Sequence, residues 1–269
     1  MLEFAVPPVP VPQPLRRTAS TPVIAVIPAR YGSSRLPGKA LADLGGRTMI
    51  EHVYARVSAA PSVGTVIVAT DDDRIAAVVQ RFGGHVRMTR RSHTSGTDRI
   101  AEVIEDLPCE IVVNVQGDEP LVEPAMIEEA VAPMLADPSL PMATLRRAIT
   151  TPADRDNPNL VKVVVSRDGD ALYFSRAPVP HLRVPGALDA AAPLGWGHVG
   201  LYVYRRTFLL AYARLEPTPL ERTESLEQLR ALEHGFRIKT VVTAYDSLGV
   251  DTPEDLERVR RLLAADARA

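Results

Sequence analysis

The sequence has little cysteine, almost no net charge and no long hydrophobic run. Its single cysteine, Cys109, excludes an internal disulfide framework and a cysteine-based zinc site. The formal net charge is −2, so nothing in the composition indicates a nucleic-acid partner or a polybasic attachment to a membrane. No apolar run approaches the roughly 18 residues that span a bilayer. With 269 residues the chain is long enough to bury a sizeable core.

The N-terminal stretch differs in composition from the rest of the chain. Five prolines lie between Pro7 and Pro14, and the basic residues follow the apolar part instead of preceding it. Proline prevents the helical segment that a secretory signal requires. We therefore expect residues 1–21 to form a flexible, extended tail, residues 22–269 to form a single domain, and the protein to be cytoplasmic.

Short apolar runs alternate with helical patterns through the first half of the chain. This alternation is typical of right-handed βαβ units around a parallel sheet, and it predicts an α/β fold. In chain order, the strands and helices that we expect span residues 23–27, 48–60, 64–70, 74–82, 85–88, 98–105 and 111–115.

The second half of the chain changes character. Strand-like runs follow one another with few helices between them, which predicts a mixed extension of the sheet at about residues 142–205, carrying a sugar-binding or partner surface. The runs span residues 142–149, 160–166, 171–174 and 199–204. Helical patterns return at residues 220–234 and from Pro253, with a strand at 237–243 between them.

The loop after the first expected strand is unusually basic. Arg30, Arg35 and Lys39 stand there together with Ser34 and two glycines. Backbone N–H groups approach a phosphate closely where glycine has no side chain, and the cations offset its charge. Ligands of open α/β sheets bind at the carboxyl ends of strands. We therefore expect a nucleotide polyphosphate here, although an ordinary basic turn would also explain the pattern.

Two acidic segments are candidates for a divalent cation. Asp118 follows the strand at residues 111–115, beside Gln116, which suits a hydroxyl group or a base. Asp251 stands just before the last expected helix. Mg²⁺ takes one or two carboxylates and completes its shell with water and phosphate oxygens. The alternatives are a simple turn at Asp118 and a helix cap at Asp251 or Thr252, with Pro253 in the first turn.

A third candidate lies ahead of the helix at residues 98–105. Thr94, Ser95 and Gly96 stand between two arginines, in a segment rich in hydroxyl groups. Helix N-termini favour anions and ligands that carry hydroxyl groups. A loop that contacts a base, a ribose or a substrate and a plain capping segment are equally compatible with this pattern.

The second half supplies a scattered set of polar residues that suits a carboxylated, polyhydroxylated sugar. Such a ligand needs a cation for its carboxylate and several hydrogen-bonding groups for its hydroxyls. For His198 the alternative is a structural histidine, and for Glu221, Glu224 and Gln228 it is the solvated face of a helix. The set also includes Arg176, Tyr202 and Glu227.

Taken in order, the motifs of the chain are IPARYGSSRLPGK, TDDDRIAAVVQRFGG, TRRSHTSGTDRIAEV, NVQGDEP, NPNLVKVV, ALYFSRAPVP, HVGLYVYR, LEQLR and VDTPEDLERVR. Together they resemble the 3-deoxy-manno-octulosonate cytidylyltransferases, or CMP-Kdo synthetases, over about residues 23–263. Other sugar nucleotidyltransferases share the opening motif, whereas TSGTDR, NVQGDEP and LYFSR are more specific. The resemblance implies a three-layer αβα nucleotidyltransferase (Rossmann-like) fold with a mixed, mostly parallel sheet, and a homodimer built largely by the second half.

The resemblance also implies a role for each candidate residue. The groups implied to act in catalysis are Arg30, Lys39, Asp118 and Asp251, the two aspartates as Mg²⁺ ligands. The nucleotide CTP would contact Ala29, Arg30, Ser34, Arg35, Lys39, Thr94, Ser95, Gly96 and Gln116. The sugar acid Kdo would contact Gln116, Arg176, His198, Tyr202, Glu227 and Gln228.

The reaction implied is attack of the anomeric hydroxyl of Kdo on the α-phosphorus of CTP, giving CMP-Kdo and pyrophosphate for glycans of the lipopolysaccharide type. Positioning and charge neutralisation would supply most of the catalysis, and no general base is evident in the sequence. Two alternatives stay open. One is a cytidylyltransferase for another 2-keto-3-deoxy sugar acid, such as an amino-Kdo or a nonulosonate. The other is a non-catalytic nucleotide-binding paralogue, against which the presence of both Asp118 and Asp251 argues.

Overall fold

The structure is a computed structural model that describes residues 23–32, 36–183, 193–246 and 248–266. Its contacts divide the chain into two compact units, residues 1–128 with 247–269 and residues 129–246. The expected tail, and Ser34 and Arg35 of the basic loop, lie outside the described residues. A single domain over residues 22–269 stays a prediction. No helix in the described ranges is long and apolar enough to cross a membrane.

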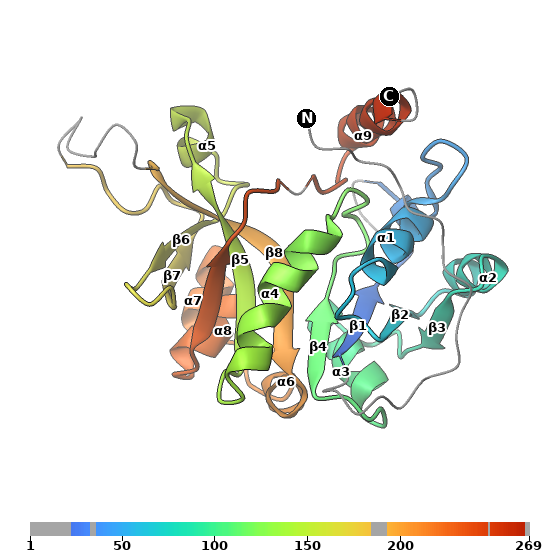
Figure 1. Ribbon diagram of the computed structural model, residues 1–269, viewed down its shortest axis with the longest axis horizontal. Helices are drawn as coiled ribbons and strands as arrows, with labels where there is room; N and C mark the ends of the chain where they lie inside the picture. The colour runs from blue at the N-terminus through green and yellow to red at the C-terminus, as the bar shows by residue number, and fades with distance from the viewer. Residues whose placement is uncertain (1–22, 33–35, 184–192, 247, 267–269) are drawn as a thin grey trace. The chain divides into compact units, whose positions relative to one another are not determined.

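The first unit contains a parallel sheet in the strand order β3-β2-β1-β4 (Figure 1). β1 lies between β2 and β4, so that Val26 is opposite Ile67 on one side and Asn114 on the other. The apolar runs of β1 and β4 are buried almost throughout, which explains their lack of polar alternation. The strands are β1 (Val23–Pro28), β2 (Thr65–Thr70), β3 (His85–Met88) and β4 (Ile111–Asn114).

Two helices of this unit begin at residues whose side chains cap them. Asp72 is the N-cap of α2 and accepts a hydrogen bond from the backbone N–H of Arg74. Ser95 caps α3 in a reciprocal capping box with Asp98. Helices α1, α2 and α3 pack against strands of this sheet. Their bounds are α1 (Met49–Ser58), α2 (Asp73–Arg81) and α3 (Gly96–Ile104), and a short 3₁₀ helix, η1 (Lys39–Leu41), precedes α1.

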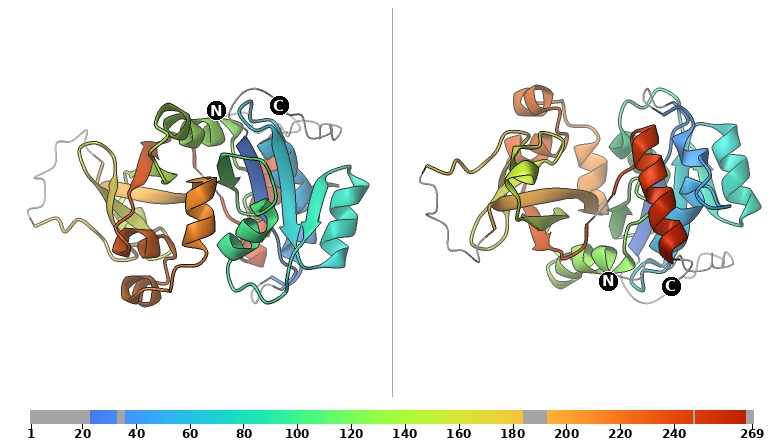
Figure 2. Two further views of the ribbon diagram at one scale, coloured as in Figure 1. Left: turned by 90° about the horizontal axis from the view of Figure 1, so that it is seen from below. Right: turned by 90° about the horizontal axis from the view of Figure 1, so that it is seen from above.

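The C-terminal helix α9 (Pro253–Asp266) belongs to the first unit. Its Leu256 and Val259 are buried against Leu44 and Met49, beside Val250. The right-hand view of Figure 2 shows α9, in red, next to the blue α1. Burying side chains of this size contributes roughly 1.5–3 kcal/mol each. This apolar contact therefore holds the segment that begins α9 at a defined place in the unit.

The second unit is built around β5 (Met142–Ile149), which pairs antiparallel with β8 (Gly195–Arg205) and parallel with β9 (Ile238–Val242). β6 (Lys162–Val165) and β7 (Ala171–Ser175) form an antiparallel pair, and Lys162 of β6 lies opposite Gly197 of β8. The register between β5 and β8 shifts between Thr144 and Leu145. The expected α/β class, with mixed but mostly parallel strand pairing, is confirmed.

The prediction of one helix over residues 220–234 is wrong. Ser225 adopts a left-handed conformation with φ of 53°, which breaks this region into two helices. Arg176 donates hydrogen bonds to the carbonyl groups of Glu224 and Ser225, and so satisfies groups that a continuous helix would have paired. Helices in and leading into this unit are α4 (Pro124–Ala136), α5 (Pro152–Asp156), α6 (Arg206–Tyr212), α7 (Pro219–Glu224) and α8 (Gln228–Glu233).

Candidate active site

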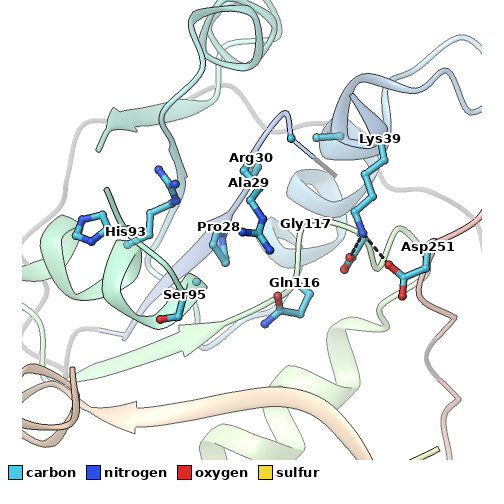
Figure 3. Close-up of a pocket in the computed structure, with 14 residues that line it drawn as sticks. Pro28, Ala29, Arg30, Lys39, His93, Ser95, Gln116, Gly117 and Asp251 are labelled. Atoms are coloured by element: carbon cyan, nitrogen blue, oxygen red, sulfur yellow. Dashed lines mark hydrogen bonds and ion pairs between the residues drawn. The ribbon is translucent and has the colours of Figure 1, made fainter. Parts of the chain in front are cut away.

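A cavity of about 510 Å³ opens in the first unit at the carboxyl ends of β1 and β4 (Figure 3). Strand order reverses between these two neighbours, because the chain continues from β1 to β2 on one side and only later adds β4 on the other. Open α/β sheets bind ligands at such a reversal. The predicted site residues among those that line it are Ala29, Arg30, Lys39, Ser95, Gly96, Gln116, Asp118 and Asp251.

Close packing of two loops shapes the floor of this cavity. A Cβ atom on Gly117 would lie 2.9 Å from the carbonyl oxygen of Pro28, too close for any other residue without movement of the backbone. Gly117 therefore lets the loop after β4 pass directly over the end of β1. As a result, Gln116 and Asp118 line the same cavity as Ala29 and Arg30.

Lys39 lies between the two predicted metal ligands. Its Nζ donates to the Asp118 carboxylate, to Oδ1 of Asp251 at 3.0 Å and to the Val250 carbonyl at 3.3 Å. Burial favours the neutral amine, but the two carboxylates outweigh it and raise the pKa of Lys39 above its ordinary value. The lysine is therefore a permanent cation, and Asp118 and Asp251 are directed at one point although they are far apart in the sequence.

Thr252, and not Asp251, caps α9. The Oγ1 of Thr252 accepts from the Asp255 backbone N–H at 3.2 Å, and the Asp255 carboxylate accepts from the Thr252 backbone N–H at 3.0 Å. This is the reciprocal arrangement of a capping box. The carboxylate of Asp251 is thereby left to face Lys39, as Figure 3 shows.

The acidic pair has the chemistry that Mg²⁺ requires. Asp118 and Asp251 already converge on a cationic group, and hard divalent ions bind through one or two carboxylates plus water and phosphate oxygens. Among the described residues, no group of three or more His, Cys, Asp or Glu side chains is placed to hold a metal. The donor set therefore fits an ion shared with a phosphate ligand better than an ion enclosed by protein alone.

Arg30 contrasts with Lys39. It is exposed, lines the cavity, and makes no hydrogen bond or ion pair with any part of the chain that the structure describes. No described residue therefore takes up the donors of its guanidinium, which are available to a ligand in that part of the structure. The neighbouring Ala29 is buried and donates its backbone N–H to the Ala69 carbonyl at 2.9 Å, which fixes the start of the loop.

The segment before α3 caps that helix and also lines the cavity, and its contact with a ligand stays a prediction. The Ser95 hydroxyl accepts from the Asp98 backbone N–H at 3.1 Å as a cap, and Ser95 and Gly96 also line the cavity. Thr94 donates to Asp98 at 3.4 Å and is not among the lining residues.

The residues of the second unit that were predicted for the sugar lie on β8, directly after β7 and at the start of α8. His198 and Tyr202 lie on β8 with ring centroids 5.3 Å apart. Arg176 follows β7 and donates its Nε to the Glu224 carbonyl at 2.9 Å and Nη1 to that of Pro158 at 3.2 Å. The guanidinium of Arg176 therefore helps to hold the chain at the end of α7, where the helix stops.

Glu227 and Gln228 begin α8. The side chain of Gln228 is buried, and the backbone carbonyl of Glu227 accepts from the Tyr212 hydroxyl at 2.5 Å. Two acidic side chains of α7 are engaged within the unit instead of forming a solvated face. Glu224 accepts from Ser175 at 2.6 Å, and Glu221 forms a two-point ion pair with Arg230.

Comparisons with known proteins bear on the family of this chain and on its fold. A model of the cytidylyltransferase family matches residues 24–239. The 3-deoxy-manno-octulosonate cytidylyltransferase of Geobacter metallireducens is 56% identical over 243 residues, 88% of this chain and 96% of the relative. This chain belongs to that family. The enzyme of the same name from Geobacter sulfurreducens is 55% identical and covers 88% of this chain and 97% of its own length.

A solved structure supports the same assignment to the 3-deoxy-manno-octulosonate cytidylyltransferase family. It is a CMP:2-keto-3-deoxy-manno-octonic acid synthetase complexed with CTP, with a TM-score of 0.86 and 47% identity, covering 91% of this chain and 99% of that one. The family resemblance expected from the motifs is confirmed, and so is the nucleotidyltransferase fold.

Two polar side chains that line the cavity of this cytidylyltransferase were missed as individual candidates. His93 lines the cavity and contacts the Glu102 carboxylate through Nε2. Arg99 also lines it, although it is only 4% exposed and pairs with Asp71 at 3.1 Å. His93 stands in the hydroxyl-rich segment before α3, and Arg99 lies in the first turns of that helix. The sequence therefore indicated this segment but not these two side chains.

Proposed function

We propose that the protein transfers the cytidylyl group of CTP to the anomeric hydroxyl of 3-deoxy-D-manno-octulosonate (Kdo), producing CMP-Kdo and pyrophosphate. The observation that carries the proposal is the convergence of Asp118, Asp251 and Lys39 in a cavity at the strand-order reversal, in a chain of this family. We also propose that the protein is a cytoplasmic homodimer that supplies glycans of the lipopolysaccharide type, as the family resemblance implies.

The charge distribution supports binding of a triphosphate. Arg30 offers a guanidinium that none of the described residues engages, and Lys39 offers a cation whose raised pKa keeps it charged. Cations placed where charge develops stabilise a phosphoryl-transfer transition state without rearranging during the reaction. We assign both side chains to the CTP phosphates, with Ala29, Ser95, Gly96 and Gln116 around the nucleoside. The assignments of Ser34, Arg35 and Thr94 to CTP remain predictions.

The chemical step exchanges one bond at phosphorus for another. The oxygen of the anomeric hydroxyl forms a bond to the α-phosphorus, the bond from that phosphorus to its bridging oxygen breaks, and pyrophosphate leaves with the electron pair while the proton passes to water. Holding the two reactants in line supplies a large part of the acceleration. In the protein without substrates, Lys39 directs the carboxylates of Asp118 and Asp251 at one point.

We propose Mg²⁺ as the cofactor, with Asp118 and Asp251 as its protein ligands. When bound, it neutralises phosphate oxygens and favours the alkoxide form of the attacking hydroxyl. The sugar acid is assigned to Gln116 and to Arg176, His198, Tyr202, Glu227 and Gln228, with the guanidinium as the group that suits its carboxylate.

Pyrophosphate release with a panel of sugar acids at fixed CTP and Mg²⁺ tests the proposal. We expect Kdo to give the highest kcat/KM, ahead of an 8-amino analogue and of a nonulosonate. A higher value for another 2-keto-3-deoxy acid would reassign the substrate. Binding of CTP without pyrophosphate release from any of them would refute catalysis and indicate a nucleotide-binding paralogue.

A further inference from the structure

Thr144 of β5 makes an unusual set of contacts. Its side chain is completely buried, and its Oγ1 lies 2.9 Å from Nε2 of His198, 2.8 Å from the carbonyl oxygen of Leu201 and 3.1 Å from that of Val199. The register between β5 and β8 shifts at this point, so that Thr144 is opposite Tyr202 while the next residue is opposite Val199. The Thr144 hydroxyl thus contacts both the carbonyl groups of the irregular stretch of β8 and the imidazole of His198.

Counting protons determines which ring nitrogen of His198 is protonated. Both carbonyl oxygens can only accept, so they take the single hydroxyl proton of Thr144. The hydroxyl oxygen must then accept from the imidazole, and Nε2 carries the ring proton. A proton on Nδ1 instead would place two lone pairs against each other at 2.9 Å.

The surroundings of the ring keep it neutral and hold its plane. Phe174 meets the imidazole edge-on with centroids 5.0 Å apart, and Tyr202 lies 5.3 Å away. Burial in this aromatic setting lowers the pKa of His198 to about 3, so the ring carries one proton at neutral pH. Within the described part of the chain, Nδ1 has no hydrogen-bond partner.

We propose that Thr144 is a positioning residue that fixes His198 as the Nε2–H tautomer, so that Nδ1 accepts a hydrogen bond from a hydroxyl group of the sugar acid. This inference rests on the proposed function, which assigns His198 to the sugar site. The tautomer also restricts the role of His198 in the sugar site. A neutral acceptor cannot pair with the sugar carboxylate, which is left to a guanidinium. The same acceptor selects a sugar acid that has a hydroxyl donor at one position.

Nitrogen NMR of protein labelled with ¹⁵N-histidine tests the tautomer directly. The His198 signals are assigned by their loss in His198→Asn. We expect a protonated, pyrrole-type Nε2 and an unprotonated, pyridine-type Nδ1 at neutral pH. We expect Thr144→Val, which keeps the shape but removes the hydroxyl, to give a mixture of tautomers, and Thr144→Ser to restore the single form.

Kinetics separate positioning from general stability. Losing one hydrogen bond to the substrate predicts a rise of about fivefold to tenfold in the KM for Kdo in Thr144→Val, with an unchanged KM for CTP. Thr144→Ser should keep the wild-type values. The matched control is Thr240→Val, because Thr240 is the register neighbour of Thr144 on β9 and its hydroxyl also donates to a carbonyl, that of Gly169 at 2.6 Å. We expect this variant to leave the tautomer and the KM for Kdo unchanged.

The failure of this inference is distinguishable from failure of the proposed function. A wild-type enzyme that converts Kdo but carries its His198 proton on Nδ1 would overturn the role of Thr144 alone. So would a Thr144→Val enzyme with an unaltered tautomer. A wild-type protein that releases no pyrophosphate with Kdo would overturn the proposed function, and the sugar contact of His198 with it. Because the wild-type spectrum alone decides the tautomer, the test survives a Thr144→Val variant that fails to fold.

Discussion

Replacing Asp251 with asparagine separates a metal ligand from a structural acid. The cap of α9 belongs to Thr252 and Asp255, so the substitution leaves the helix terminus intact. The bond that it weakens is the 3.0 Å ion pair with Lys39, in which the Asp251 side chain is 48% exposed. Ion pairs of this exposure contribute about 0–1 kcal/mol. For a chain of this size we therefore expect Tm to fall by no more than about 4 °C.

The effect on catalysis should be far larger. An ion that polarises phosphoryl oxygens contributes several kcal/mol to the transition state. Losing about 3 kcal/mol of this contribution corresponds to a decrease on the order of 10²-fold in kcat. Asparagine retains a carbonyl oxygen but not the charge, so the Mg²⁺ concentration required for half-maximal rate should also rise.

The assay is pyrophosphate release as a function of Mg²⁺, together with a thermal melt of the same preparation. Thr252→Ala is the matched control, because loss of an N-cap costs about 1 kcal/mol without removing a carboxylate from the cavity. It should melt lower than wild type and keep its kcat and Mg²⁺ dependence, the reverse of the pattern for Asp251→Asn. An unaltered kcat in Asp251→Asn would remove Asp251 from the site and refute the reasoning.

Two further substitutions test the CTP half of the cavity. Arg30→Ala should raise the KM for CTP by about 10- to 100-fold through loss of a charge-assisted hydrogen bond, with Tm unchanged because Arg30 has no partner among the described residues. Steady-state kinetics measure this effect, with Arg91→Ala as the control, because Arg91 is an exposed arginine outside the cavity lining. A change confined to the KM for Kdo would contradict the prediction. Gly117→Ala should lower the free energy of unfolding by about 1–3 kcal/mol, since its Cβ would lie 2.9 Å from the Pro28 carbonyl oxygen. Denaturant unfolding should show no such loss in Gly249→Ala, where a Cβ would meet nothing within 4 Å, and equal losses in the two variants would argue against the packing role of Gly117.

Local signals in the sequence were sufficient for the parallel sheet and for most of its helix starts. Apolar runs such as Ile111–Asn114 have no polar alternation because both faces are covered, and the caps at Asp72 and Ser95 depend only on residues within one turn. The break between α7 and α8 was missed for the opposite reason. It depends on hydrogen bonds from Arg176, which lies far from Ser225 in the sequence.

The sequence by itself determined the family, the α/β class and the segments that line the cavity, because these are encoded in short motifs and in apolar periodicity. Only the tertiary structure decided which side chains meet. It directed Asp118 and Asp251 at the same ammonium group of Lys39, and it assigned the α9 cap to Thr252. It also set Thr144 against His198. Such pairings depend on strand order and register, which bring distant segments together at distances that no local pattern encodes.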